Sequence, residues 1–155
     1  MAVEFAIICL PLIALFLAAM QLGVIFLVNQ MMQDAVTTAS REIRTGQIQT
    51  GGIGSVSMRE RICEDLVLVA NCPANLQLAV NSFATLEDAA NADLYTSTGA
   101  PIINNEYDPG GPNEIVVVSI AITYPIGFVN YFAPEDGSAQ RLAVSMVARS
   151  ENYEE

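Results

Sequence analysis

The chain has 155 residues and a formal charge of −11, from 17 acidic residues and six basic residues that are all arginine. A surface this acidic repels nucleic acid, so nucleic-acid binding is not expected. Without histidine the chain cannot form a histidine-dependent triad or an imidazole metal cluster, and no Walker loop or GxGxxG motif is present. We therefore expect no enzyme, with no catalytic residue, no cofactor and no metal.

The first predicted element is a transmembrane helix over residues 1–30. An uncharged apolar segment of 24 residues runs from Phe5 to Val28. At about 1.5 Å per residue this segment spans roughly 36 Å, which exceeds the ~30 Å hydrocarbon core of a bilayer. A secretory signal peptide is the alternative, but its apolar region has about 7–15 residues, follows basic residues and ends at a small-residue cleavage site. The segment has none of these features, so we expect it to stay in the mature protein.

Small residues and a proline indicate that this helix packs on other helices. Ala14 and Ala18, and likewise Ala19 and Gly23, lie one helical turn apart, which lets a neighbouring backbone come close. Pro11 removes one backbone hydrogen bond and favours a kink.

Glu4 is the acidic residue that borders the apolar segment, directly before Phe5. One interpretation is an interfacial charge that reaches toward the headgroups. The other is an assembly role, in which Glu4 pairs with the N-terminal ammonium group of a neighbouring subunit. A charge inside such a bundle costs several kcal/mol unless it is paired, so the pair would fix the register of the subunits.

The helical pattern continues beyond the span to about residue 45. Its apolar positions recur at spacings of three and four, with polar residues between them, which is typical of an amphipathic helix. The stripe consists of Met32, Val36, Ala39 and Ile43. We expect residues 31–45 to continue the span, to rest on a small domain, and to end at Gly46.

A second helix is predicted from Ser57 to Ala70, with Ser57 and Glu60 at the spacing of a capping box. Cys63 and Cys72 lie near its end, nine residues apart, without a second cysteine pair or a histidine. A disulfide is therefore favoured over a zinc site, and two reduced core cysteines are the alternative. Cys9, in the span, is predicted to be a buried free thiol.

The cysteines also bear on orientation. Arg41 and Arg44 follow the span and, taken alone, would place that side in the cytoplasm. Disulfides form outside the cytosol, so the pair Cys63 and Cys72 places the domain outside the cytoplasm. The missing basic flank on the other side is explained if a basic leader preceded Met1.

Three strands are predicted in the second half of the chain, and the polar segments between them are predicted to be loops. The strands cover residues 76–81, 114–124 and 140–150. The loops cover residues 84–113, with a short helix near 85–90, and residues 126–138. Acidic and amide side chains in the first loop fit no calcium-binding spacing, and a solvated loop is expected. They are Asn104, Asn105, Glu106, Asp108 and Glu114. The fold class is therefore α+β, a long N-terminal transmembrane helix with a second helix and a roughly three-stranded antiparallel sheet.

Four sequence features together resemble the TadE-type pseudopilins of tight-adherence (Tad) pili, which are type IV pilin-like. They are the opening AVEFAIICLPLI, the cysteine pair, the strand VVVSIAITYP and the ending VARSENY. The most specific is Val3-Glu4-Phe5 entering an apolar segment with Pro11 six residues further on.

The resemblance implies a structural subunit, a minor pilin or pseudopilin, with an assembly helix at residues 1–30 and an extracytoplasmic pilin-like domain at residues 31–155. Its assembly residues would be Glu4, Phe5, Pro11, Ala14, Ala18, Ala19 and Gly23. It also implies a precursor whose leader is removed by a prepilin peptidase, residence in the bacterial inner membrane, and then a place in a pilus among other pilin subunits at the cell surface. The alternatives are a principal filament subunit, a membrane-anchored adhesin that binds a surface through residues 84–113, and a bitopic periplasmic protein that never assembles and has an unrecognised enzyme activity.

Overall fold

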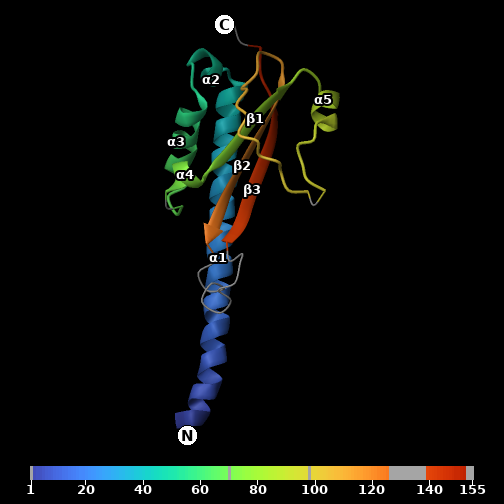
Figure 1. Cartoon of the computed structure of the whole chain (residues 1–155). Helices are drawn as coiled ribbons and strands as arrows, with labels where there is room; N and C mark the ends of the chain where they lie inside the picture. The colour runs from blue at the N-terminus through green and yellow to red at the C-terminus, as the bar shows by residue number, and fades with distance from the viewer. Residues whose placement is uncertain (1, 70, 98, 126–138, 153–155) are drawn as a thin grey trace.

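The computed structural model describes residues 2–69, 71–97, 99–125 and 139–152, so the loop predicted at residues 126–138 lies outside the described residues. One long helix, α1 (Ala2–Arg44), runs the length of the molecule, and a domain is built on its C-terminal half (Figure 1). The elements that follow are α2 (Gln47–Thr50), α3 (Ser55–Asp65), α4 (Cys72–Asn75), β1 (Gln77–Phe83), α5 (Leu86–Asn91), β2 (Ile115–Pro125) and β3 (Ala139–Arg149).

The three strands form one antiparallel sheet in the order β1-β2-β3. At its middle, Val118 of β2 lies opposite Val80 of β1 and Met146 of β3. The sheet lies across the upper half of α1, with β3 making the most extensive contact with the helix (Figure 1). The predicted α+β fold, with a long apolar N-terminal helix and a three-stranded antiparallel sheet, is confirmed.

The core of the domain lies between the upper half of α1 and the sheet. The predicted stripe of Met32, Val36, Ala39 and Ile43 is buried there. The stripe begins one turn earlier than predicted, because Val28 is also completely buried. From Val28 onward, therefore, α1 is a core element of the domain.

Glycine ends α1 as expected. Gly46 adopts a left-handed backbone conformation with φ of 76°, and its N–H donates to the carbonyl of Ile43 over 3.0 Å. Glycine tolerates this conformation without the steric cost that a Cβ imposes. The chain then reverses through α2, a single turn that the sequence did not indicate, and Ile48 of this turn is buried in the core.

The second predicted helix is shorter and earlier than expected, since α3 covers Ser55–Asp65 and not Ser57–Ala70. The capping box at Ser57 and Glu60 was also wrong. The residue before α3 is Gly54, with no side-chain cap, and its carbonyl accepts from the N–H of Met58 over 3.0 Å. The helix ends because Leu66 leaves helical geometry and turns into the core, where it is 1% exposed.

The segment at residues 84–113 contains the expected short helix, α5, which is capped by the Thr85 hydroxyl accepting from the N–H of Asp88 over 3.1 Å. The rest of the described segment forms no further helix or strand, as predicted, but part of it is bound to β1. The N–H of Val80 donates to the carbonyl of Glu106 over 2.9 Å, and the N–H of Asp108 donates to the carbonyl of Val80 over 2.8 Å. The physical reason is that β1 is an edge strand, so its outward N–H and C=O groups need partners, and residues 106–108 supply them through a bridge between Val80 and Tyr107.

Candidate assembly surface

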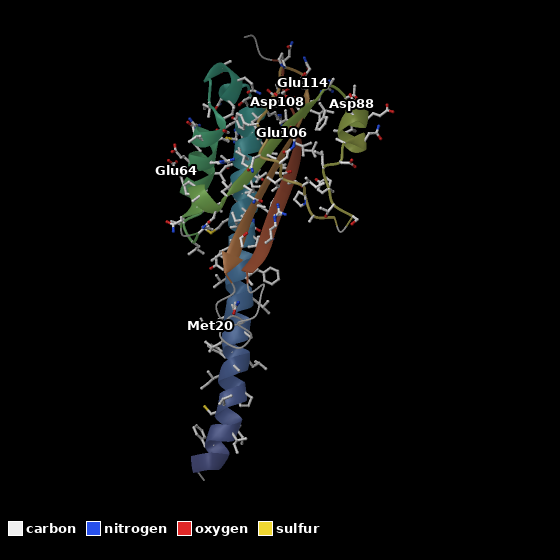
Figure 2. All side chains as sticks on the ribbon, viewed as in Figure 1. Met20, Glu64, Asp88, Glu106, Asp108 and Glu114 are labelled. Carbon is white, nitrogen blue, oxygen red and sulfur yellow. A yellow bond between two sulfur atoms is a disulfide. The ribbon has the colours of Figure 1, made fainter. Side chains whose placement is uncertain are left out.

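The lower half of α1 projects beyond the domain with its apolar side chains uncovered (Figure 2). Between Phe5 and Val24, every large apolar side chain is at least 40% exposed, and Phe5 reaches 72%. The described part of the chain has one helix that is long and apolar enough to cross a membrane. Met20 lies on this half, whereas the labelled acids Glu64, Asp88, Glu106, Asp108 and Glu114 all lie on the domain (Figure 2).

Both halves belong to one unbroken helix. α1 has 43 residues, which at about 1.5 Å per residue is roughly 65 Å. The helix continues through Pro11, which lies inside it. Because the domain is packed around the upper half, a partner that binds the lower half also fixes the orientation of the domain relative to that partner.

The predicted small-residue positions lie on the exposed part of the helix. Ala14 and Ala18 are partly exposed, and Ala19 and Gly23 are exposed. At about 100° per residue the two pairs face different sides, so the helix offers two places for close approach. The structure does not bring these residues together with one another or against another described element.

At position 23 the single chain itself does not require a residue as small as glycine. A Cβ placed there would meet no atom within 4 Å. Glycine in the middle of a helix costs about 1 kcal/mol relative to alanine. Nothing in the described chain compensates for this cost, so any benefit of Gly23 must come from contact with another molecule.

Glu4 belongs to α1, but its side chain lies outside the described residues. The pairing of Glu4 with a neighbouring subunit therefore remains a prediction. Cys9 is a free cysteine, as expected, and it is partly exposed in the single chain.

The second candidate feature is the disulfide between Cys63 and Cys72, which is present, with a Cα–Cα distance of 5.6 Å. It joins the last turn of α3 to the start of α4, and Cys72 is buried in the core. In the short loop that it closes, Leu66 points inward, whereas Val67 is 80% exposed.

The carboxylates of the acidic segment at residues 104–114 form hydrogen bonds within the segment and to β1. Asp108 accepts from the Ser82 hydroxyl over 2.5 Å and from the N–H of Gly110 over 3.1 Å. Glu114 accepts from the N–H of Gly111 over 2.7 Å. The described residues contain no group of three or more histidine, cysteine, aspartate or glutamate residues placed to hold a metal ion.

Three contacts of the domain were missed at the level of sequence because they join distant segments. Arg44 of α1 forms an ion pair with Glu151 over 2.7 Å, and the Ser40 hydroxyl donates to the Met146 sulfur over 3.3 Å. The Tyr107 hydroxyl donates to the carbonyl of Ile53 over 2.8 Å. Burial raises the pKa of Tyr107 above its usual value, and the negative charge of Glu42 raises it further.

Comparison with known proteins finds a similarity that lies on α1. Residues 1–41 match the family model described as TadE-like protein. The N-terminal segment is TadE-like. This match ends within the last turn of α1 and supports a TadE-type, pilin-like protein of Tad pili. No curated protein and no solved structure matches the chain significantly.

The TadE-like match agrees with the geometry of the helix. The TadE-like family is pilus-associated and structural and is not a known enzyme family. A long apolar N-terminal helix together with this family suggests anchoring in a membrane and association with other components of a Tad pilus. The domain beyond residue 41 lies outside the match.

Proposed function

We propose that the chain is a minor subunit of a Tad-type pilus, which packs through the lower half of α1 to initiate or build the filament used in surface adherence. One observation carries this proposal. The lower half of a single unbroken helix offers an apolar surface that no other described element covers, and its upper half is the central helix of the domain.

The lower half of α1 would first lie in the bacterial inner membrane and later against other pilin subunits. Lipid and neighbouring helices are equally apolar, so transfer from one to the other gains little hydrophobic free energy. Close packing must then supply the preference for the filament. The exposed Ala14, Ala18, Ala19 and Gly23 are suited to this because they let backbones approach.

The domain would lie outside the cytoplasm. The disulfide between Cys63 and Cys72 supports this orientation, because such bonds persist in oxidising compartments. A prepilin peptidase would process the precursor, as expected for a pilin-like protein with a TadE-like N-terminal segment.

Glu4→Gln tests the assembly role directly. If Glu4 pairs with an N-terminal ammonium group of a neighbour, the substitution leaves that cation unpaired, which costs on the order of 3–5 kcal/mol. Filament yield should fall by over a hundredfold at about 1.4 kcal/mol per decade. Membrane abundance should not fall, because losing a charge makes insertion easier.

The matched control is Glu64→Gln, which removes an exposed carboxylate from α3. Membrane fractions and sheared filaments from both strains are compared by immunoblot. Normal filament yield with Glu4→Gln would show that Glu4 is an interfacial charge.

An exchange of the anchor separates a pilus subunit from an anchored adhesin. Residues 1–27 are replaced by an unrelated single span, which leaves the buried residues from Val28 onward in place. A pilus subunit should lose its contribution to piliation and adherence, whereas an anchored adhesin should keep its adherence.

A further inference from the structure

Within the described residues, the outer edge of β3 carries no partner strand and can accept one. β3 pairs with β2 along one side, and among the described residues no other backbone group bonds to it between Leu142 and Ala148. This stretch, LAVSMVA, contains no proline, glycine or charge. Free edges with these properties are templates for an added strand, and most proteins block them.

A groove follows this edge along α1, and we name it the α1–β3 groove. Its lower part has a volume of about 400 Å³ and lies between Asn29, Gln33 and Thr37 of the helix and residues 143–146 of the strand. Its upper part has a volume of about 670 Å³ and continues along residues 146–151. Thr37 and Met146 line both parts, so the groove is continuous.

The helix wall of the groove is polar. Asn29, Gln33, Thr37 and Arg41 recur every fourth residue and therefore form one ridge along α1. The Ser40 hydroxyl bonds the Met146 sulfur, which joins helix and strand beside this ridge. An inserted strand would thus meet backbone groups of β3 on one side and amide or hydroxyl side chains of α1 on the other.

Positive charge collects at the upper end of the groove. Three of the six arginines of this acidic chain, Arg41, Arg44 and Arg149, line it. Arg44 is held by Glu151. Among the described residues the guanidinium group of Arg41 has no hydrogen bond or ion pair, and that of Arg149 has only a contact of 3.4 Å with the carbonyl of Asn113.

We propose that the α1–β3 groove binds an extended peptide segment of a partner protein as an added fourth strand, with carboxylates at the end of the segment that lies against Arg41 and Arg149. A second copy of this chain fits less well, because two copies each carry a net charge of −11. Antiparallel pairing of two β3 strands would also place Arg141 of one near Arg149 of the other. The proposal depends on the described domain alone and not on the role of the chain in a pilus.

The test measures binding of synthetic peptides to the full chain in detergent micelles by fluorescence anisotropy. The probe is a labelled peptide of alternating valine and threonine with three glutamates at one end, made in both chain directions. At least one direction should bind, and the tighter one is used further. The same peptide with three lysines should bind at least about 10-fold more weakly, and rising salt should weaken the glutamate peptide.

Variants then assign the site. Arg41→Gln together with Arg149→Gln should weaken the glutamate peptide about 3- to 10-fold, whereas Arg61→Gln, in the groove between α1 and α3, should not. A peptide with N-methylated central amides cannot donate to a strand edge and should bind at least about 10-fold more weakly.

The proposal is overturned if neither glutamate peptide binds, if the lysine peptide binds equally, or if N-methylation has no effect. It is also overturned if the double variant binds as the unmodified chain does. A double variant that dimerises more strongly, measured by light scattering, would show that the natural occupant is a second copy.

Discussion

The two halves of α1 contain similar apolar residues but use them in opposite ways. Between Phe5 and Val24 every large apolar side chain is at least 40% exposed. Beyond this half, Val28, Met32 and Ile43 are completely buried against the domain. The helix backbone is continuous across the change, so the difference lies in the side chains alone.

What separates the halves is the distribution of polar residues around the helix. The lower half is apolar on every side, so only an apolar environment on every side, such as lipid or a bundle of helices, can cover it. The upper half has a polar ridge that includes Gln33 and Arg41, which confines its apolar residues to one stripe. The sheet, together with α2 and α3, is sufficient to cover that stripe.

The largest expected effect comes from cutting the helix at different points. A fragment of residues 28–155 retains every buried residue of α1 and should be soluble and folded. A fragment of residues 34–155 loses Val28 and Met32 and should still fold, with a loss of about 2–5 kcal/mol. A fragment of residues 46–155 exposes the sheet face and should aggregate. Size-exclusion chromatography and circular dichroism compare the three, and equal behaviour would contradict docking of α1 on the domain.

A matched pair of substitutions tests the same contrast without truncation. Ile43→Ala removes a completely buried side chain and should lower the free energy of unfolding of the domain by about 2–5 kcal/mol. Ile13→Ala shortens a side chain that is 52% exposed on the lower half and should leave this free energy unchanged. Urea unfolding of the full chain in detergent, followed by tyrosine fluorescence, measures both. A similar loss in both variants would mean that the two halves are not independent.

Much of this architecture could be predicted from the sequence because it rests on local patterns. The alternation of apolar residues indicated the strands, the stripe from Met32 to Ile43 indicated the docked helix, and the spacing of Cys63 and Cys72 indicated the disulfide. These signals depend on residues close together in the chain, and the structure contains the corresponding elements.

The parts that could not be predicted depend on contacts between distant segments. α3 ends at Asp65 because Leu66 enters a core that only the whole domain creates. Likewise, the backbone of residues 106–108 bonds to Val80 because the outer edge of β1 needs hydrogen-bond partners, which polar composition alone does not reveal. The α1–β3 groove was missed for the same reason, since Arg41 and Arg149 meet only after folding.

The disulfide should matter to the domain and not to the lower half of α1. Replacing both Cys63 and Cys72 with alanine should lower the stability of the domain by about 2–3 kcal/mol, through the lost constraint on the unfolded chain. Partition of the full chain into membranes should not change. In the unmodified protein, thiol labelling after unfolding without reductant should modify only Cys9, detected by mass spectrometry. Labelling of all three cysteines would contradict an oxidised domain outside the cytoplasm.

The smallest expected effect concerns Tyr107. It lies in the loop beside the edge of β1, and its hydroxyl bonds to the segment before α3. Tyr107→Phe removes the hydrogen bond to the carbonyl of Ile53 and should cost about 1 kcal/mol. The comparison variant is Tyr95→Phe, whose hydroxyl contacts Ser145 at a 45% exposed position and should cost less.

The pH dependence of stability gives Tyr107 a second, independent measurement. The pKa of Tyr107 is raised in the folded state by burial and by Glu42 of the upper half of α1. The unfolded chain therefore loses this proton first, near its ordinary pKa of about 10. Above that pH the unfolded state binds fewer protons than the folded state, so the free energy of unfolding should fall as pH rises toward the folded pKa. Urea unfolding is measured between about pH 8 and about pH 11, a range that brackets the ordinary tyrosine pKa of about 10. The free energy of unfolding should show this decline in the unmodified chain and a weaker decline in Tyr107→Phe. Parallel curves would mean that Tyr107 ionises alike in both states and that the charge on α1 does not act on it.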